Sequence, residues 1–216
     1  MHRETMEYDV VIVGGGPSGL ATAIKFAQLN NKNNTNYSIC LLEKGSEIGA
    51  HILSGNVFQP NALDELIPNW KELNAPLNVP VKKDKIFYFL KNIGIPVPPF
   101  VMPAMNNHGN YVISLGNLCR WLGEHAESLG VEIFPGFPAS KLLIEDDKVV
   151  GVQTGDMGIS ESGELKDANE PGINIKAKMT VLGEGCRGHL GKQVISKFNL
   201  SDGKDPQHYG IGFKEV

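Results

Sequence analysis

A glycine-rich turn near the start of the chain constrains the fold more than any other feature. Residues 8–26 read YDVVIVGGGPSGLATAIKF. Val10–Val13 is a β-branched run, which is typical of a strand buried on both faces. Apolar residues then recur at three- and four-residue steps, which predicts an amphipathic helix from about Pro17 to Leu29. The glycines therefore lie in a turn that joins a buried strand directly to a helix.

Gly14, Gly16 and Gly19 in this turn match the pattern G-x-G-x-x-G. In this context the first glycine permits the tight turn, the second lets the backbone approach a pyrophosphate, and the third lets helix and strand pack closely. The free N–H groups and the positive dipole end of the helix then face the phosphates. The turn predicts a dinucleotide site, although a glycine-rich turn without a ligand is the structural alternative.

An acidic residue stands where a ribose-binding carboxylate is expected. A second predicted strand, Ser38–Leu42, ends in Glu43, a little over 20 residues past the fingerprint. A glutamate accepts hydrogen bonds from ribose hydroxyls and repels a 2′-phosphate, which argues against NADP. These residues leave open whether the dinucleotide is FAD or NAD.

Composition excludes several classes of function. The 216 residues carry a net charge of −4 without a basic run, which argues against nucleic acid as a partner. Cys40, Cys119 and Cys186 are too far apart for a disulfide framework or a metal motif, so we expect reduced structural thiols. The polar N-terminus runs into the first strand and leaves no room for a signal or transit peptide, and no apolar run has the length of a membrane span.

An uncharged, proline-rich segment is the second unusual stretch. Residues 93–105 read IGIPVPPFVMPAM and follow a predicted strand, Lys85–Leu90. The prolines forbid a continuous helix and the length is too short to span a bilayer. The segment is either an extended piece buried in the core or an exposed apolar surface for a membrane or a hydrophobic substrate. Chemistry alone favours the buried alternative.

The remaining patterns predict alternating helices and strands. Lys44–Gly55 is rich in glycine and is either a loop close to the ligand or an ordinary irregular loop. The other expected elements are an asparagine-rich loop at 30–36, helices at 61–67 and 117–129, strands at 111–114, 131–134 and 173–182, a β-hairpin at 141–145 and 149–154, and a polar loop at 155–172.

A second glycine-rich turn, 183–188, lies between a predicted strand and a helical run to Phe198. It is either a helix-capping turn or a second approach of the backbone to the same cofactor or to a second nucleotide.

Several stretches together resemble the electron transfer flavoprotein-ubiquinone oxidoreductase family, from one end of the chain to the other. They are VVIVGGGPSGL (10–20), LLEKGSEIGAHILSG (41–55), IPVPP with MPAMNNHGNYVISLG (95–116), and GEGCRGHLGKQ (183–193), continuing to HYGIGFKEV. The first motif is shared by many FAD and NAD proteins, whereas GAHILSG and MNNHGNY are more specific.

The resemblance implies a Rossmann-like α/β FAD-binding fold of the glutathione-reductase type, with an inserted β-rich subdomain on the ubiquinone side. It implies that the fold is incomplete at the C-terminus. Gly14, Gly16, Gly19 and Glu43 would then contact the ADP half of FAD, and residues 49–55 would run near the flavin. The implied cofactor-binding set is Gly14, Gly15, Gly16, Pro17, Ser18, Gly19, Glu43, Lys44, Gly49, Ala50, His51, Ser54, Gly55 and Gly185.

The family also implies partners and a location. Electrons would pass from reduced electron transfer flavoprotein to ubiquinone, at the cytoplasmic face of a bacterial inner membrane or at the mitochondrial inner membrane of a eukaryote. Residues 87–105 resemble the family's shallow membrane contact, so the exposed alternative for the proline-rich segment now leads. Because the cofactors carry this chemistry, no catalytic side chain is predicted.

The chain departs from the family in its length. Family members are considerably longer, and the four cysteines that hold their 4Fe-4S cluster lie near the far end, so cluster and ubiquinone are expected only with a missing C-terminal part. The predicted division is 1–80 and 111–200 for the FAD-binding domain, 81–110 for the apolar segment, and 201–216 for the start of a quinone domain. The rival interpretations are an NAD(P)H-dependent FAD reductase or hydroxylase and a non-catalytic dinucleotide-binding fragment.

Overall fold

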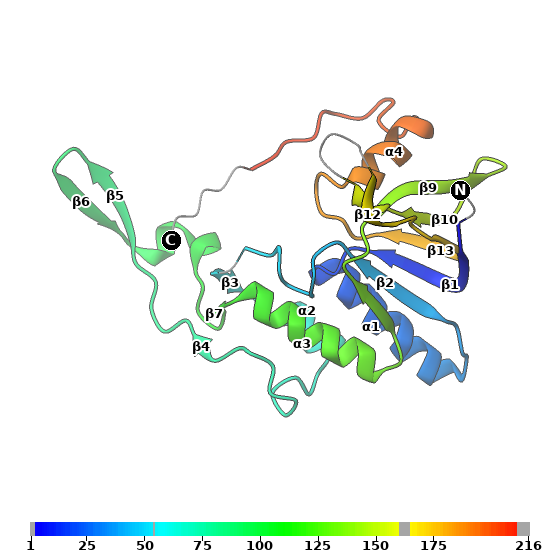
Figure 1. Ribbon diagram of the computed structural model, residues 1–216. Coiled ribbons are helices and arrows are strands. Elements are labelled where there is room, and N and C mark those ends of the chain that lie inside the picture. The colour runs from blue at the N-terminus through cyan, green and yellow to red at the C-terminus, as the bar shows by residue number, and fades with distance from the viewer. Residues whose placement is uncertain (1–2, 54, 160–164, 211–216) are drawn as a thin grey trace.

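A six-stranded mixed sheet forms the centre of the computed structural model, which describes residues 3–53, 55–159 and 165–210 (Figure 1). The first four strands in the order below run parallel, and the last two are antiparallel to their neighbours. The spatial order is β8 (Glu132–Pro135), β2 (Ile39–Glu43), β1 (Thr5–Val13), β13 (Asn174–Leu182), β10 (Lys148–Thr154) and β9 (Ala139–Glu145).

Strand β1 lies inside the sheet and is buried on both faces. Val10 and Ile12 belong to the apolar layer on one face, whereas Val11 and Val13 belong to the layer on the other. Alternate side chains of a strand point to opposite faces, so an unbroken run of β-branched residues suits a strand covered on both sides. The predicted strand is confirmed, and it begins earlier, at Thr5.

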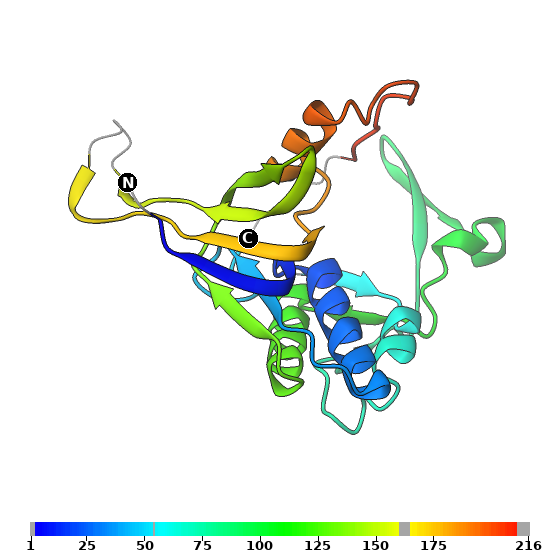
Figure 2. The same ribbon diagram turned by 90° about the vertical axis from the view of Figure 1, so that its right-hand side faces the viewer.

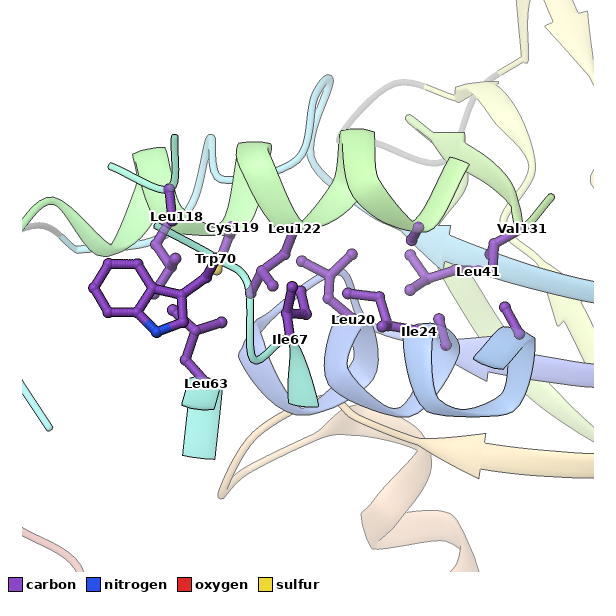
Figure 3. Close-up of a cluster of buried hydrophobic side chains, with 14 of the residues drawn as sticks. Leu20, Ile24, Leu41, Leu63, Ile67, Trp70, Leu118, Cys119, Leu122 and Val131 are labelled. Atoms are coloured by element: carbon purple, nitrogen blue, oxygen red, sulfur yellow. The ribbon is translucent and has the colours of Figure 1, made fainter. Parts of the chain in front are cut away.

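Two long helices, α1 (Pro17–Asn33) and α3 (Leu115–Ser128), cover one face of the sheet. Figure 3 shows side chains of both helices meeting between the ribbons, among them Leu20, Ile24 and Leu122. The short helix α2 (Asn61–Leu66) and the buried Trp70 close one end of this layer, where the indole Nε1 of Trp70 donates to Asp64 at 2.7 Å.

The other face of the sheet is covered by a smaller apolar layer. Leu190 of α4 (His189–Lys197) is fully buried there with Val152 and Ile175. The turn between β9 and β10 is formed by two aspartates with φ of 47° and 56°, as a tight hairpin turn requires. The predicted β-hairpin is thereby confirmed (Figure 2).

Several predicted boundaries differ from the structure by one or more residues, and for two helices a capping residue explains the difference. Helix α1 continues through Asn33 and stops at Asn34, whose φ of 54° is the left-handed conformation that asparagine tolerates. Helix α3 begins at Leu115 because the Ser114 hydroxyl accepts a hydrogen bond from the Asn117 amide at 3.3 Å.

The polar loop predicted at 155–172 is wrong in its described part, which contains two strands. Strands β11 (Met157–Ile159) and β12 (Leu165–Glu170) pair there, and residues 160–164 of the predicted loop lie outside the described residues. The Asp156 carboxylate holds the base of this pair, because it accepts from the Arg3 guanidinium and from the Gly172 amide at 2.8 Å. This contact spans more than 150 residues, and no local pattern reveals it.

The proline-rich segment leaves the body of the molecule. A small sheet of β3 (Asn56–Phe58), β7 (Tyr111–Ile113) and β4 (Val79–Pro80) leads into the hairpin of β5 (Ile86–Leu90) and β6 (Ile93–Val97), followed by single 3-10 turns at Pro99–Val101 and Pro103–Met105. Figures 1 and 2 show this hairpin projecting from the sheet and helices.

Side chains of the segment are open to solvent: Ile93 is 64% and Phe100 is 82% exposed. Burial in the core, which chemistry alone favoured, is therefore wrong. The division of the chain into domains stays a prediction.

Two of the three cysteines are the structural thiols expected from the sequence. Cys40 and Cys119 are buried, and burial raises the pKa of the Cys40 thiol to about 12. Cys186 is exposed in the turn before α4, which departs from that expectation. Among the described residues, no helix has both the length and the apolar character to cross a bilayer.

Candidate dinucleotide-binding site

A cavity of about 710 Å³ lies at the carboxyl edge of the parallel strands. The ends of β2 and β13 flank the end of β1 in register, Val13 with Leu42 on one side and with Leu182 on the other. The helical connection leaves β1 toward β2, whereas β13 lies on the opposite side, so the chain diverges here. Open α/β sheets bind ligands outside the carboxyl ends of their strands at such a position, and the volume is in the usual range of ligand pockets, roughly 300–1,000 Å³.

Two of the fingerprint glycines are required for packing. Gly14 has a φ of 107°, and a Cβ there would come within 2.5 Å of the Gly183 carbonyl oxygen. A Cβ at Gly19 would overlap the carbonyl oxygen of Gly14. The sharp turn and the close approach of helix to strand are both as the pattern predicted.

Gly16 differs from both, because a Cβ built on it meets no atom within 4 Å. It is the N-cap residue of α1, no side chain caps that helix, and Pro17 and Ser18 line the cavity beside it. The first N–H groups of a helix have no partner within the helix and carry its positive dipole end. The space in front of Gly16 therefore suits a negatively charged group such as a pyrophosphate.

Glu43 holds the fingerprint loop in place and also borders the cavity. Its carboxylate accepts from the Gly15 amide at 2.8 Å and from the Gly45 amide at 2.7 Å. A carboxylate offers about four acceptor positions, so two stay available for hydroxyl donors in the cavity. A second role thus accompanies the predicted ribose contact, because the same group shapes the turn that follows β1.

The glycine-rich loop after β2 contributes part of the lining. Lys44, Gly49 and His51 line the cavity as predicted. Ile52, which was not among the predicted cofactor-binding residues, lines it beside them. Gly49 has a φ of 87° and packs so closely on α3 that a Cβ would lie 2.7 Å from the Gly116 carbonyl oxygen. This glycine therefore fixes the loop against the helix layer.

The predicted cofactor-binding residues occupy different positions around the cavity. Gly14, Gly16, Pro17, Ser18, Glu43, Lys44, Gly49, His51 and Gly185 line it. Gly15 in the fingerprint loop and Gly19 in α1 do not line it, Ala50 and Gly55 are exposed outside the lining, and Ser54 falls outside the described residues. The contacts of these residues with a cofactor stay predictions.

The second glycine-rich turn forms the opposite wall, and it is a capping turn that also borders the cavity. The Gly183 amide donates to the Val13 carbonyl at 2.7 Å, which joins the turn to the fingerprint loop. The Glu184 carboxylate accepts from the amides of Leu190 at 3.1 Å and Gly191 at 2.9 Å and so caps α4. Gly185 and Arg187 line the cavity from this side.

The segment 137–140 completes the lining and was not predicted from the sequence. Strand β8 lies beside β2 and parallel to it, so the chain that leaves β8 arrives at the same edge of the sheet. The Phe137 amide donates to the Glu43 carbonyl at 3.0 Å and the Gly136 amide to the Gly45 carbonyl at 2.7 Å. The sequence did contain a turn signal, because PGFPAS has one glycine and two prolines at the end of a predicted strand. Only the strand order shows that this turn lies beside the cavity.

Acidic, histidine and cysteine side chains do not gather into a metal site within the described part of the chain. Titratable side chains do line the cavity, and the two carboxylates among them, Glu43 and Glu184, both accept hydrogen bonds from backbone amides.

A family profile described as the NAD(P)-binding Rossmann-like domain matches residues 12–71. This range contains the fingerprint, α1 and β2. Together with the mixed sheet, the match confirms the Rossmann-like α/β fold predicted from the sequence.

Curated relatives match the chain along its whole length. It is 56% identical to a probable electron transfer flavoprotein-ubiquinone oxidoreductase of Acinetobacter baylyi and 55% identical to the electron transfer flavoprotein-ubiquinone oxidoreductase of Pseudomonas aeruginosa. The human mitochondrial protein of that name is 48% identical. The match covers 100% of this chain but 39%, 40% and 35% of the three relatives, so the chain spans about two fifths of their length or slightly less.

Solved structures share the fold at low identity. A geranylgeranyl bacteriochlorophyll reductase-like protein of Thermoplasma acidophilum superposes with a TM-score of 0.63 at 22% identity, over 87% of this chain and 42% of that one. The p-nitrophenol 4-monooxygenase of Pseudomonas putida gives 0.56 at 21% identity, over 90% and 44%. At such identities the likeness is one of fold.

Proposed function

We propose, because the chain belongs to the electron transfer flavoprotein-ubiquinone oxidoreductase family, that it forms the FAD-binding part of an oxidoreductase that passes electrons from electron transfer flavoprotein to ubiquinone. The observation that carries the proposal is the open space before Gly16 at the uncapped end of α1. That space lies inside a cavity large enough for a cofactor. The activity is proposed for complete family members, of which the chain spans about two fifths.

The residues present fit the adenosine and pyrophosphate part of FAD. The N-terminus of α1 supplies N–H donors and positive potential for the pyrophosphate, and the absence of a side chain at Gly16 leaves it room. The free acceptor positions of Glu43 suit ribose hydroxyls, and its charge disfavours the 2′-phosphate of NADP. Gly185 and Arg187 line the opposite wall, where they limit how far the cofactor extends toward α4.

FAD supplies the redox chemistry when it is bound, and the protein supplies binding, orientation and access. This division explains why the proposal assigns no side chain to acid–base work. A 4Fe-4S cluster and ubiquinone are part of the proposed activity of the complete enzyme, and we assign neither of them to residues of this chain.

Flavin binding tests the proposal. Gly16→Val places a branched side chain in the space meant for the pyrophosphate, so we expect the purified variant to lack the flavin absorption bands. Flavin at full occupancy in that variant would refute the placement of the cofactor.

Electron donors distinguish the proposed enzyme from its rival. In a complete family member, rapid reduction of the flavin by reduced electron transfer flavoprotein, with none by NADH, supports the proposal. Reduction by NADH would instead identify an NAD(P)H-dependent reductase or hydroxylase.

A membrane contact belongs to the same proposal. Residues 86–105 carry many exposed apolar side chains. They belong to the projecting hairpin (Figure 1) and the two turns after it. Large exposed apolar patches mark interaction or membrane surfaces. Charges introduced by Val97→Asp and Phe100→Asp should weaken flotation with liposomes, and unchanged flotation would count against this contact.

A further inference from the structure

Charge is distributed unevenly between the projecting segment and the rest of the chain. Residues 79–113, from the start of β4 to the end of β7, contain four lysines and one aspartate, a formal charge of +3. The remaining residues contain sixteen basic and twenty-three acidic side chains, a formal charge of −7. The two parts together give the net charge of −4. The projecting apolar surface therefore lies on a positively charged part of the chain, whose remaining residues are acidic overall.

The four lysines border the apolar surface at both ends. Lys82, Lys83 and Lys85 precede β5, and Lys91 lies in the turn between β5 and β6; all four are exposed. The hairpin between them is apolar on both faces. On one face Tyr88 pairs with Ile95 and Leu90 with Ile93 across the two strands. Phe87 and Phe89 alternate with them on the other face, where their ring centroids lie 6.0 Å apart.

The single aspartate of this region is already engaged at the base of the segment. The Asp84 carboxylate accepts from the backbone amide of Asn107 at 2.8 Å and from its side-chain amide at 3.2 Å. The Val81 amide donates to the Asn110 carbonyl at 2.8 Å beside it. These bonds join the two ends of the segment, so Asp84 holds its base together. Within the described part of the chain, none of the four lysines forms an ion pair.

We infer that this surface recognises anionic phospholipid headgroups, with Lys82, Lys83, Lys85 and Lys91 at the headgroup level and the apolar side chains of residues 86–105 between them. The inference rests on the proposed membrane contact and names the lipid class it requires. Lysines near an anionic membrane surface each contribute about a fivefold increase in binding, and the acidic body is repelled, so the charges also orient the molecule. Because Lys91 lies at the hairpin tip, the hairpin lies along the surface rather than entering the hydrocarbon tip first.

Vesicle binding of the 216-residue chain tests the inference. We compare vesicles of phosphatidylcholine alone with vesicles that contain about 30 mol% phosphatidylglycerol, at about 50 mM and about 500 mM NaCl, where the Debye length shrinks severalfold. We expect at least tenfold stronger binding to the anionic vesicles at low salt and a much smaller difference at high salt.

Lysine variants supply the matched control. K82Q/K83Q/K85Q should weaken binding to anionic vesicles about 100-fold at low salt and leave binding to neutral vesicles unchanged. K25Q/K32Q/K148Q, which removes three exposed lysines of the body, should change neither. K91Q should weaken anionic binding about fivefold; tighter binding would overturn the flat orientation.

The outcomes separate the inference from the membrane contact on which it rests. Equal binding to neutral and anionic vesicles, unaffected by K82Q/K83Q/K85Q, overturns the inference and keeps the membrane contact. No binding to either vesicle by a chain with native circular dichroism overturns both. A salt-sensitive dimer in sedimentation, with no vesicle binding, would show instead that the surface contacts a second copy of the chain.

Discussion

Replacing Gly16 by alanine should separate cofactor affinity from stability. The backbone of Gly16, with φ −83° and ψ −179°, is one that alanine adopts without strain, and its Cβ would meet no protein atom within 4 Å. Alanine lowers the entropy of the unfolded chain, worth about 0.4–1 kcal/mol, but it is a poorer N-cap than glycine by a similar amount. We therefore expect the melting temperature to move by less than about 4 °C.

The effect on FAD should be much larger. The added methyl occupies the space in which the proposed pyrophosphate approaches the N-terminus of α1, so the phosphates are displaced from the N–H groups there. Hydrogen bonds to charged groups contribute about 1.5–3 kcal/mol each. Losing two such hydrogen bonds costs roughly 3–6 kcal/mol of binding free energy, which raises the dissociation constant for FAD by about 100-fold or more.

Titration of the apo chain with FAD, followed by flavin fluorescence, measures the affinity, and thermal unfolding measures the stability. Gly19→Ala is the contrasting variant, because its Cβ overlaps the backbone of Gly14 and should lower the melting temperature by several degrees. Gly210→Ala is the matched control, since its Cβ also points into open space. An FAD affinity of Gly16→Ala within about threefold of the wild type would contradict the proposed position of the pyrophosphate.

Three further perturbations test other contacts of the site and fold. Glu43→Gln places an amide donor against the amide of Gly15 or Gly45, so thermal unfolding should show a loss of about 1–3 kcal/mol; an unchanged midpoint would contradict its role in the loop. Glu184→Ala removes the cap of α4 at a cost of about 0.5–2 kcal/mol, and amide exchange should accelerate at Leu190 and Gly191 and not in α3. Hydrogen bonds from Arg3 and then from the Gly172 amide lower the pKa of Asp156 to about 2, so its stabilising effect is complete above about pH 4 and is lost as pH falls toward 2; Asp156→Asn should flatten this part of an acid titration of stability, and an unaltered acid limb would exclude this group.

The sequence predicted the parts of the site that depend on local geometry. A turn that follows a buried strand and opens a helix requires glycine where backbone meets backbone, and Gly14 and Gly19 are in such contacts. The second strand could be predicted from its short apolar run, which ends at Glu43. That position places Glu43 at the edge of the cavity. These features are determined within about 35 residues of chain.

The parts that the sequence did not predict depend on contacts between distant segments. Segment 137–140 lines the cavity only because β8 pairs with β2, and the Glu184 carboxylate at the cavity edge accepts hydrogen bonds from the first turn of α4. Strands β11 and β12 are tied down by Arg3 from the other end of the chain. For residues 93–105 hydrophobicity indicated burial, whereas their exposure follows from the short base closed by Asp84 and Asn107.

The contact between the two glycine turns has a consequence for how the protein is made. Gly14 and Gly183 are in contact at the edge of the cavity although they are 169 positions apart, so one of the two turns is synthesised long before the other. At about 5–20 residues per second, a ribosome needs roughly 10–30 s between these two glycines. During that interval the nascent chain has the helix end that would attract a nucleotide, but it lacks the strand that holds this loop in its final shape. Loading of the proposed cofactor should therefore follow the docking of β13, because a nucleotide meets both walls of the cavity only after that strand and the turn behind it have been synthesised.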